Sequence, residues 1–361
     1  MQMQQQKVDD LLAQFEVLVD VKGSAGVLSL SRPQALNALT HGMIQLIRHY
    51  FDVWESDPAI THIILRSLSP KAFCAGGDVR AVYEMAKAGD PTWSAFFADE
   101  YCLNSRIKHY PKPVISLIDG IVMGGGVGLS GHGSYRIGSQ KTLFAMPEVG
   151  IGFFPDVGAS HMLPRLRSLE VGLYSALSGA RLSQADSMWA GILTHCVPSE
   201  RFTDLLQALT ESADIDGVLA GFAGEPAEAS VLAAHEGALQ ACFSKGSVAE
   251  ILAALDAVSG EDAEWAQKTA GMIRSRSPMS VNVSFAELHK GATMEFDDCM
   301  VMEYRILHRV LEGNDFYEGI RAVLVEKDNL PDWQPKRFED VDMAEVDTYF
   351  SEPKDGDLVL R

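Results

Sequence analysis

The stretch PVISLIDGIVMGGGVGLSG, residues 113–131, decides the fold class of this chain. It begins with a β-rich run, PVISLI (113–118), and passes into three consecutive glycines, Gly124, Gly125 and Gly126. Glycine loses more conformational freedom on folding than other residues, so clustered glycines indicate a backbone that turns tightly or approaches a ligand closely. The stretch therefore predicts a buried strand that leads into such a backbone.

Short β-rich runs and helical patterns alternate on both sides of this stretch. GVLSL (26–30) and HIILRS (62–67) are strand candidates, and a helix between them would begin after Thr40, a capping residue, and close at Pro58. This alternation predicts an α/β fold over residues 1–210. The apolar residues of the predicted helix recur at three- and four-residue spacings: Met43, Ile44, Ile47, Tyr50, Phe51 and Trp54.

The pattern changes at about residue 211. Segments such as SVAEILAALDAVS (247–259) are alanine-rich and amphipathic, with hardly any β-branched alternation. A further helix is predicted earlier in the chain, over residues 91–108. We therefore predict two domains, an α/β core over residues 1–210 and a helical C-terminal region over residues 211–361.

Composition narrows the function classes. The 361 residues include 49 acidic and 30 basic ones, for a formal net charge of -19. Such a chain repels nucleic acid backbones and anionic lipid surfaces, so we expect neither as a partner. No apolar run reaches the roughly 18 to 20 residues that span a bilayer. An anionic ligand would need a local basic patch.

The cysteines and the N-terminus predict a cytoplasmic protein, or one of the mitochondrial matrix if the source is eukaryotic. Residues 1–15 lack both a basic start and a continuous apolar stretch, and they are too acidic for a typical transit peptide. The cysteines are odd in number, scattered and without a CxxC pair, which indicates reduced thiols. They are Cys74, Cys102, Cys196, Cys242 and Cys299.

Three glycine-dense stretches are candidate parts of one site. They are KAFCAGGD (71–78), DGIVMGGGVGLSG (119–131) and FAMPEVGIGFFPDVG (144–158). The first two can each present backbone N–H groups, and two convergent N–H donors make an oxyanion hole. Any single stretch could equally be an ordinary tight turn or a close helix–strand contact. The three together, each ending near a carboxylate, favour a site.

KAFCAGGD and KPVISLIDGIVMGGGVGLS resemble the two oxyanion-hole segments of the crotonase superfamily, and MPEVGIGFFPDVG makes the resemblance closest to its 3-hydroxyisobutyryl-CoA hydrolase family. The resemblance implies a spiral of repeated ββα turns with a helical C-terminal region. It also implies hydrolysis of the 3-hydroxyisobutyryl-CoA thioester, a step of valine breakdown. Hydrolysis of another short 3-hydroxyacyl-CoA, hydratase or isomerase activity, and non-catalytic acyl-CoA binding are the alternatives.

The resemblance implies that the N–H groups of Gly77 and Gly125 bind the thioester oxygen, and that the glycine triplet starts a helix whose positive end faces the developing charge. Enoyl-CoA hydratases carry one glutamate two residues beyond the triplet and another twenty residues later. Here Gly128 occupies the first position and Glu148 the second. With one of two acid/base groups missing, hydratase activity should be weak or absent.

Glu148 is the principal catalytic candidate, either as a nucleophile or as a general base for water. It lies in an apolar stretch, where an ionised group is rarely placed without a use. The resemblance gives Asp156 a role in orienting substrate or moving a proton, and gives Glu100 a place near the acyl hydroxyl. Asp156 could instead cap the turn before a helix, and Glu100, beside Asp99, could be a surface residue.

The resemblance also places coenzyme A. The backbone of Ala72, Phe73 and Ala75 would receive the adenine, Arg32 would lie along the coenzyme, and Lys71 could meet a phosphate. Solvation for Lys71 and a salt bridge at a helix entry for Arg32 are the alternatives. We expect an acyl-CoA substrate and no separate cofactor, and the sequence leaves a homo-oligomer open.

Two local patterns point to other enzyme classes. GVGLSG (126–131) satisfies the GxGxxG pattern of dinucleotide binding, but the acid that would complete it, Glu148, follows a proline and precedes a glycine-rich loop. GLSGH carries His132 where a serine-hydrolase elbow requires glycine. The ten histidines form no HExxH motif and no cluster with cysteines, so we expect no metal ion.

Overall fold

The computed structural model describes residues 16–360, so the N-terminal segment interpreted above, residues 1–15, lies outside the described residues. The chain forms two compact units, each built from three segments. The domain boundary that the sequence pattern places at residue 210 stays a prediction. The first unit comprises Met1–Asp78, Asp99–Phe144 and Leu182–Ala229, and the second comprises Val79–Ala98, Ala145–Arg181 and Ser230–Arg361.

A six-stranded sheet organises the first unit. The outer strand β1 pairs antiparallel with β2, and the remaining neighbours that pair are parallel. The three predicted strand runs fall in β2, β3 and β5, and HIILRS matches β3 from end to end. In spatial order the strands are β1 (Val17–Lys22), β2 (Ala25–Leu30), β3 (His62–Ser67), β5 (Val114–Ile118), β7 (Tyr135–Gly138) and β9 (His195–Cys196).

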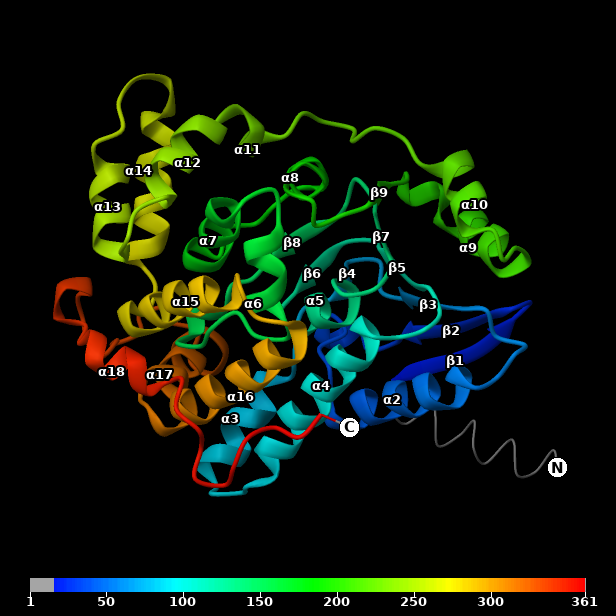
Figure 1. The fold of residues 1–361 in the computed structure, drawn as a ribbon, viewed down its shortest axis with the longest axis horizontal. Helices are drawn as coiled ribbons and strands as arrows, with labels where there is room; N and C mark the ends of the chain where they lie inside the picture. Colours follow the sequence, from blue (N-terminus) through cyan, green and yellow to red (C-terminus); the bar gives the residue numbers. More distant parts are fainter. Residues whose placement is uncertain (1–15, 361) are drawn as a thin grey trace. The chain divides into compact units, whose positions relative to one another are not determined.

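A second, three-stranded sheet consists of β4 (Ala72–Cys74), β6 (Ile121–Met123) and β8 (Leu143–Ala145). Each of β3, β5 and β7 is followed by one strand of this smaller sheet. Helices α3 (Val79–Lys87) and α4 (Thr92–Lys108) follow β4, and α5 (Gly125–Ser130) follows β6. These repeated ββα turns confirm the predicted α/β class and the implied spiral (Figure 1).

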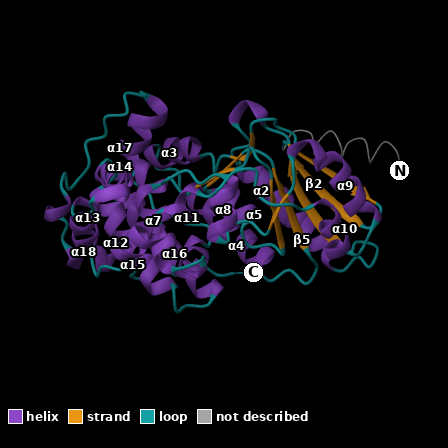
Figure 2. Cartoon of the chain, turned by 90° about the horizontal axis from the view of Figure 1, so that it is seen from above, coloured by secondary structure: helices purple, strands orange, loops and turns teal. Residues whose placement is uncertain are grey.

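Helices cover both faces of the six-stranded sheet, whose strands are orange in Figure 2. Helices α9 (Phe202–Glu211) and α10 (Ile215–Phe222) bury their apolar residues against one face, with Val27 and Ile64 in the same cluster. Side chains alternate between faces along a strand, so Gly26 faces the other side. A Cβ on Gly26 would lie 2.5 Å from the ring of Trp54, which leaves room for glycine alone.

The predicted helix after Thr40 is α2 (His41–Glu55). The hydroxyl of Thr40 accepts a hydrogen bond from the N–H of Met43 at 3.3 Å, which is the expected cap. Five of the six residues of its predicted apolar face are buried, and Tyr50 is half-buried. The other helix of the first unit is α8 (Gln184–Ala190).

The second unit is helical, and within residues 16–360 no strand follows β9, as the sequence predicts. No helix in this described range is long and apolar enough to cross a membrane. The short 3-10 helix η2 (Glu148–Ile151) precedes α6 (Ala159–Met162) and α7 (Leu169–Ser178). The later helices are α11 (Val231–Ala234), α12 (Glu236–Phe243), α13 (Val248–Asp256), α14 (Ala263–Arg274), α15 (Pro278–Gly291), α16 (Phe296–Glu312), α17 (Asp315–Ile320) and α18 (Met343–Thr348).

Candidate active site

Two glycine loops of the first unit converge at Gly77 and Gly125. A Cβ placed on Gly125 would lie 3.1 Å from the amide nitrogen of Gly77. Gly125 is the first residue of α5, as predicted, and Gly124 before it has a φ of 49°. Gly76 has a φ of 115°. Because residues other than glycine rarely adopt such positive φ values, both turns depend on glycine.

The N–H groups of Gly77 and Gly125 donate no hydrogen bond within the part of the chain that the structure describes. The adjoining groups are engaged: the N–H of Leu39 donates to the carbonyl of Gly76 at 2.8 Å, and that of Asp78 to the carbonyl of Leu39 at 2.9 Å. The loop is therefore held in place while two neighbouring donors stay available. Such a pair can stabilise negative charge on one oxygen atom.

Glu100 belongs to the same place. Its side chain, on α4, is 2% exposed, and its Oε1 lies 2.4 Å from a Cβ built on Gly125. The adjacent Asp99 points elsewhere, pairing with Arg48 and, at 2.7 Å, with His41. Of the two neighbouring acids, Glu100 is therefore buried at the glycine loops and Asp99 forms an ordinary half-exposed ion pair.

Glu148 lies in the second unit, where it begins η2. Its side chain is 6% exposed, and its Oε2 has no hydrogen-bond partner among residues 16–360. Burial raises the pKa of Glu148 well above the usual value of a carboxyl, and the charge of Asp156 raises it further. A carboxylate held in this way is a stronger base than one in water, which suits proton abstraction or attack on a carbonyl carbon.

Asp156 is 5% exposed and follows the buried Phe153 and Phe154. The alternative that it caps a helix is not what the structure shows. The N-cap of α6 is Gly158, without a side-chain cap, and the backbone carbonyl of Asp156 accepts a hydrogen bond from the N–H of Ala159 at 3.0 Å.

Two acids of the second unit that are completely buried were not predicted from the sequence. Glu287 lies on α15 and Glu303 on α16, and both side chains are 0% exposed. Their charges act on each other and on Asp156, and the charge of Glu148 acts on Glu287. The signal that could have revealed Glu287 is its position between Val283 and Gly291, four residues from each on one helix face. Within residues 16–360, no group of His, Cys, Asp and Glu side chains could hold a metal ion.

The predicted coenzyme A residues have mixed surroundings. Arg32 forms ion pairs with Glu16 at 2.8 Å and with Asp78 at 2.9 Å, which matches the salt-bridge alternative. Lys71 is exposed. Its side chain thus lies at the surface, where a phosphate could reach it.

The backbone predicted to receive adenine is partly engaged. The carbonyls of Ala72 and Phe73 accept hydrogen bonds from the side-chain amide of Asn37 at 3.3 and 2.9 Å. The N–H of Ala75 donates to the carbonyl of Leu36 at 3.0 Å. The aromatic ring of Phe73 is fully buried, so only the backbone of this residue could contact a ligand.

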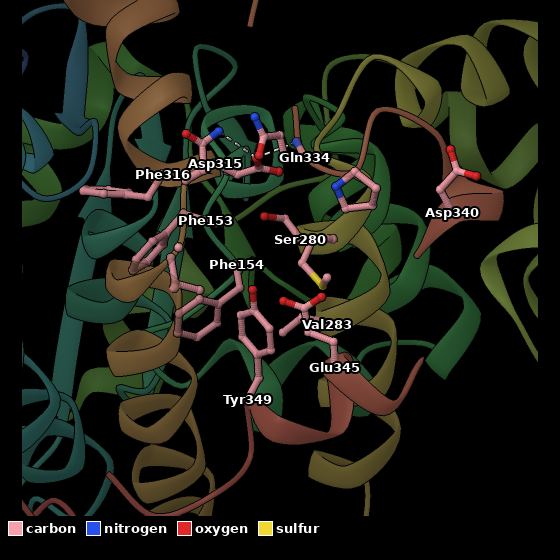
Figure 3. Close-up of a pocket in the computed structure, with 16 residues that line it drawn as sticks. Phe153, Phe154, Ser280, Val283, Asp315, Phe316, Gln334, Asp340, Glu345 and Tyr349 are labelled. Atoms are coloured by element: carbon pink, nitrogen blue, oxygen red, sulfur yellow. Dashed lines mark hydrogen bonds between the residues drawn. The ribbon is translucent and has the colours of Figure 1, made fainter. Parts of the chain in front are cut away.

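A cavity of about 350 Å³ lies in the second unit (Figure 3). The aromatic rings of Phe153, Phe154 and Tyr349 line one side of it. Asp315 lies on another side, where it accepts a hydrogen bond from the N–H of Gln334 at 2.8 Å. Glu148 and Asp156 are not among the lining residues, so this cavity is separate from the predicted catalytic carboxylates.

Comparison with known proteins gives a consistent family. The model of the enoyl-CoA hydratase/isomerase family matches residues 25–350. A protein from Xenopus tropicalis is 43% identical over 96% of this chain and 91% of its own length, and one from Homo sapiens is 39% identical over 95% and 90%. Both are named 3-hydroxyisobutyryl-CoA hydrolase, mitochondrial.

Two solved structures share the fold closely. A carnitinyl-CoA dehydratase from Mycobacterium thermoresistibile is 40% identical, with a TM-score of 0.90 over 96% of this chain and 98% of its own. An enoyl-CoA hydratase from Rhodobacter sphaeroides is 34% identical, with a TM-score of 0.88 over 95% and 99%. The arrangement of helices and strands described above is thus one that experimental structures contain.

Proposed function

This chain belongs to the enoyl-CoA hydratase/isomerase family, and from that membership we propose that it hydrolyses the thioester of 3-hydroxyisobutyryl-CoA. The products are 3-hydroxyisobutyrate and coenzyme A, and the reaction is a step of valine breakdown. One observation carries the proposal: relatives about 40% identical over nearly the whole chain are named for this hydrolysis. The chain is therefore an acyl-CoA thioester hydrolase.

The oxyanion hole is the first part of the proposed mechanism. The N–H groups of Gly77 and Gly125 would bind the thioester oxygen and stabilise the negative charge that develops on it. In other acyl-transfer enzymes the loss of one such donor raises the barrier by roughly 2.7–4 kcal/mol. Both N–H groups donate no other hydrogen bond in the described chain, which supports this role.

Glu148 supplies the second part. As a general base it would take a proton from water while the hydroxide adds to the carbonyl carbon; as a nucleophile it would form a mixed anhydride that water then cleaves. In both routes the carbon–sulfur bond breaks and the thiolate of coenzyme A takes up a proton. Asp156 is the candidate to assist, because its charge acts on Glu148.

A hydratase or dehydratase is the second candidate, since the two solved structures carry those names. The residue at the first hydratase position is Gly128, which lies buried inside α5. A glycine offers no proton-transfer group, so addition of water across a double bond would lack one of its two acids. This position favours hydrolysis over hydration.

Release of free thiol from 3-hydroxyisobutyryl-CoA tests the proposal. The native chain and a Glu264→Gln control, in which an exposed acid of α14 is changed, should both release thiol, whereas Glu148→Gln should not. Release by all three proteins, or by none, would contradict the proposed role of Glu148. Formation of a hydroxyacyl-CoA from an enoyl-CoA, without thiol release, would favour the hydratase.

Three further expectations stay predictions. Coenzyme A arrives as part of the substrate, so we expect full activity without an added cofactor. Several relatives are named as mitochondrial proteins, which agrees with a matrix location if the source is eukaryotic. The third expectation is that the chain can form a homo-oligomer, which light scattering would measure.

A further inference from the structure

Glu287 is a buried acid that the mechanism above does not use. It lies near the end of α15, with none of its surface exposed. Neither of its carboxyl oxygens has a hydrogen-bond partner within residues 16–360. A carboxylate without hydrogen bonds is costly to bury, so a glutamate at this place is expected to stay neutral unless a cation compensates it.

The helix that carries Glu287 packs directly on the segment that follows Asp156. Gly291, one turn after Glu287, lies so close to α6 that a Cβ there would be 2.1 Å from the carbonyl oxygen of Ser160. The N–H and hydroxyl of the same Ser160 donate to Glu303 at 3.1 and 2.5 Å. Glu287 and Gly291 are four residues apart and lie on the same face of α15, so Glu287 is on the face that packs against the segment after Asp156.

Glu303 and Glu287 differ in what compensates their charge. Glu303 accepts those two hydrogen bonds from Ser160 and a third from the N–H of Gly158 at 2.8 Å. These bonds lower its pKa, which burial nevertheless raises to about 8. Burial likewise raises the pKa of Glu287 well above normal, and no hydrogen bond opposes it. Glu303 thus has hydrogen-bond donors that favour its charged form, whereas Glu287 has none within residues 16–360.

In the described range, residues 16–360, no basic group compensates the charge of Glu287. The charges that act on it are those of Glu303, Asp156 and Glu148, all of the same sign. The basic side chains on α15 and on the elements packed against it lie against other groups. On α16, Arg305 pairs with Asp357, Arg309 pairs with Glu312, and His308 lies against the rings of Trp93 and Tyr304. Arg165 donates to the carbonyls of His161, Gly291 and Met294, His161 lies against the ring of Phe296, His289 bonds the carbonyl of Phe285, and Lys290 lies over the ring of Phe350. The other ionisable groups of these elements are acids or neutral side chains: Glu170, Tyr174, Glu250, Asp256, Asp297, Asp298, Cys299, Tyr304, Glu312, Glu345 and Asp347.

We propose that Glu287 is a positioning residue of the hydrolytic site: it stays a neutral carboxylic acid beside Asp156 and Glu148, so that the buried carboxyl groups carry only the charge that catalysis uses. Like charges in a shared apolar site oppose one another, so a second carboxylate here would disfavour negative charge on Glu148 and on the thioester oxygen. This role of Glu287 in catalysis rests on the proposed hydrolysis.

The pH dependence of kcat tests this role, after subtraction of uncatalysed hydrolysis. As Glu287 ionises at alkaline pH, kcat of the native chain should fall, and Glu287→Gln should remove that decline. At the alkaline pH where kcat of the native chain is about tenfold below its maximum, kcat of the variant should be within about twofold of the variant's own maximum. Glu287→Met, which is similar in size and needs no hydrogen bonds, gives the same test if the amide proves unstable. Asp298→Asn removes an exposed acid from α16 and should keep the native profile.

Infrared spectroscopy of the resting protein reads the proton directly. The native chain at neutral pH should show the carbonyl stretch of protonated carboxylic acids, and Glu287→Gln should lower its intensity while Asp298→Asn keeps it. Superimposable pH profiles, loss of kcat by both Glu287 variants at every pH, or the absence of the infrared difference would each overturn the proposal. A native chain that shows the infrared band but releases no thiol would contradict the proposed function instead.

Discussion

The carboxylate of Glu100 lies against Gly125: a Cβ on the glycine would be 2.4 Å from Oε1 of the glutamate. The same Cβ would be 3.1 Å from the amide nitrogen of Gly77. The absence of a side chain at Gly125 thus lets one N–H donor and one buried acid come close to this glycine. We place the thioester oxygen at the two N–H groups and the acyl hydroxyl of the substrate near Glu100.

A side chain at Gly125 should stop the reaction, because it would displace the groups packed against this glycine. Gly125→Val would project two methyl groups toward Gly77 and Glu100, so we expect kcat/KM for thiol release to fall by about 10²-fold or more, the cost of losing an oxyanion-hole donor. Gly237 is the matched control, because nothing lies within 4 Å of its Cβ position and it lies on an exposed part of α12. Gly237→Val should retain kcat/KM, and an active Gly125→Val enzyme would remove this glycine from the site.

The acid limb of the pH profile should report Glu148. A general base or nucleophile must be ionised, so kcat is present above the pKa of Glu148 and lost as the pH falls through it. Because burial and the charge of Asp156 raise that pKa, the midpoint should lie above the ordinary glutamate value of about 4.3. Asp156→Asn should move the midpoint to lower pH, whatever it does to the maximal rate. An unmoved midpoint would show that the two carboxyl groups are not coupled.

The acyl hydroxyl should decide specificity. A site that hydrogen-bonds a substrate hydroxyl rejects the analogue without it by about 10⁴-fold or more, whereas one methyl group changes the free energy by only about 1–3 kcal/mol. We therefore expect 3-hydroxyisobutyryl-CoA to be hydrolysed far faster than isobutyryl-CoA, and Glu100→Gln to narrow that difference. Equal kcat/KM values for the two thioesters would refute a hydroxyl-reading pocket.

Stability should fall with rising pH because of the buried acids. The folded-state pKa of Glu303 is raised from 4.5 to about 8, and that of Glu287 is raised as well, so the folded chain binds these protons more tightly than the unfolded chain. The contribution of Glu303 is fully present below pH 4.5 and is lost as the pH rises through about 8, and that of Glu287 is lost as the pH rises through its own raised pKa. The melting temperature of Glu287→Met should therefore decline less over this interval than that of the native chain, as calorimetry would measure. Parallel curves would contradict the raised pKa of Glu287.

Several elements were readable from local sequence because one physical cause dominates each. HIILRS is a strand from its first residue to its last, since a buried parallel strand is apolar on both faces. Thr40 marks the start of α2 because its hydroxyl satisfies an N–H that the helix leaves unpaired. The burial of Glu148 and Asp156 likewise followed from their apolar neighbours in the chain.

Other features depend on contacts between distant segments. The ββα turns begin at His62, Val114 and Tyr135, so their intervals are unequal and no fixed period appears in the sequence. Glu303 is held by Gly158 and Ser160, about 145 residues away in the chain, and nothing near Glu303 in the sequence indicates them. The interleaving of segments in the two units is equally invisible to local patterns.

The two unengaged amides of Gly77 and Gly125 also bear on ligand binding to the folded state. A polar group that is removed from bulk water without a hydrogen-bond partner destabilises the native chain. A ligand that accepts from both N–H groups would remove this free-energy cost in each protein molecule that binds it. Ligands that bind only the native chain raise its melting temperature by mass action. A non-hydrolysable thioester analogue should therefore protect the protein against heat more than coenzyme A alone at equal saturation.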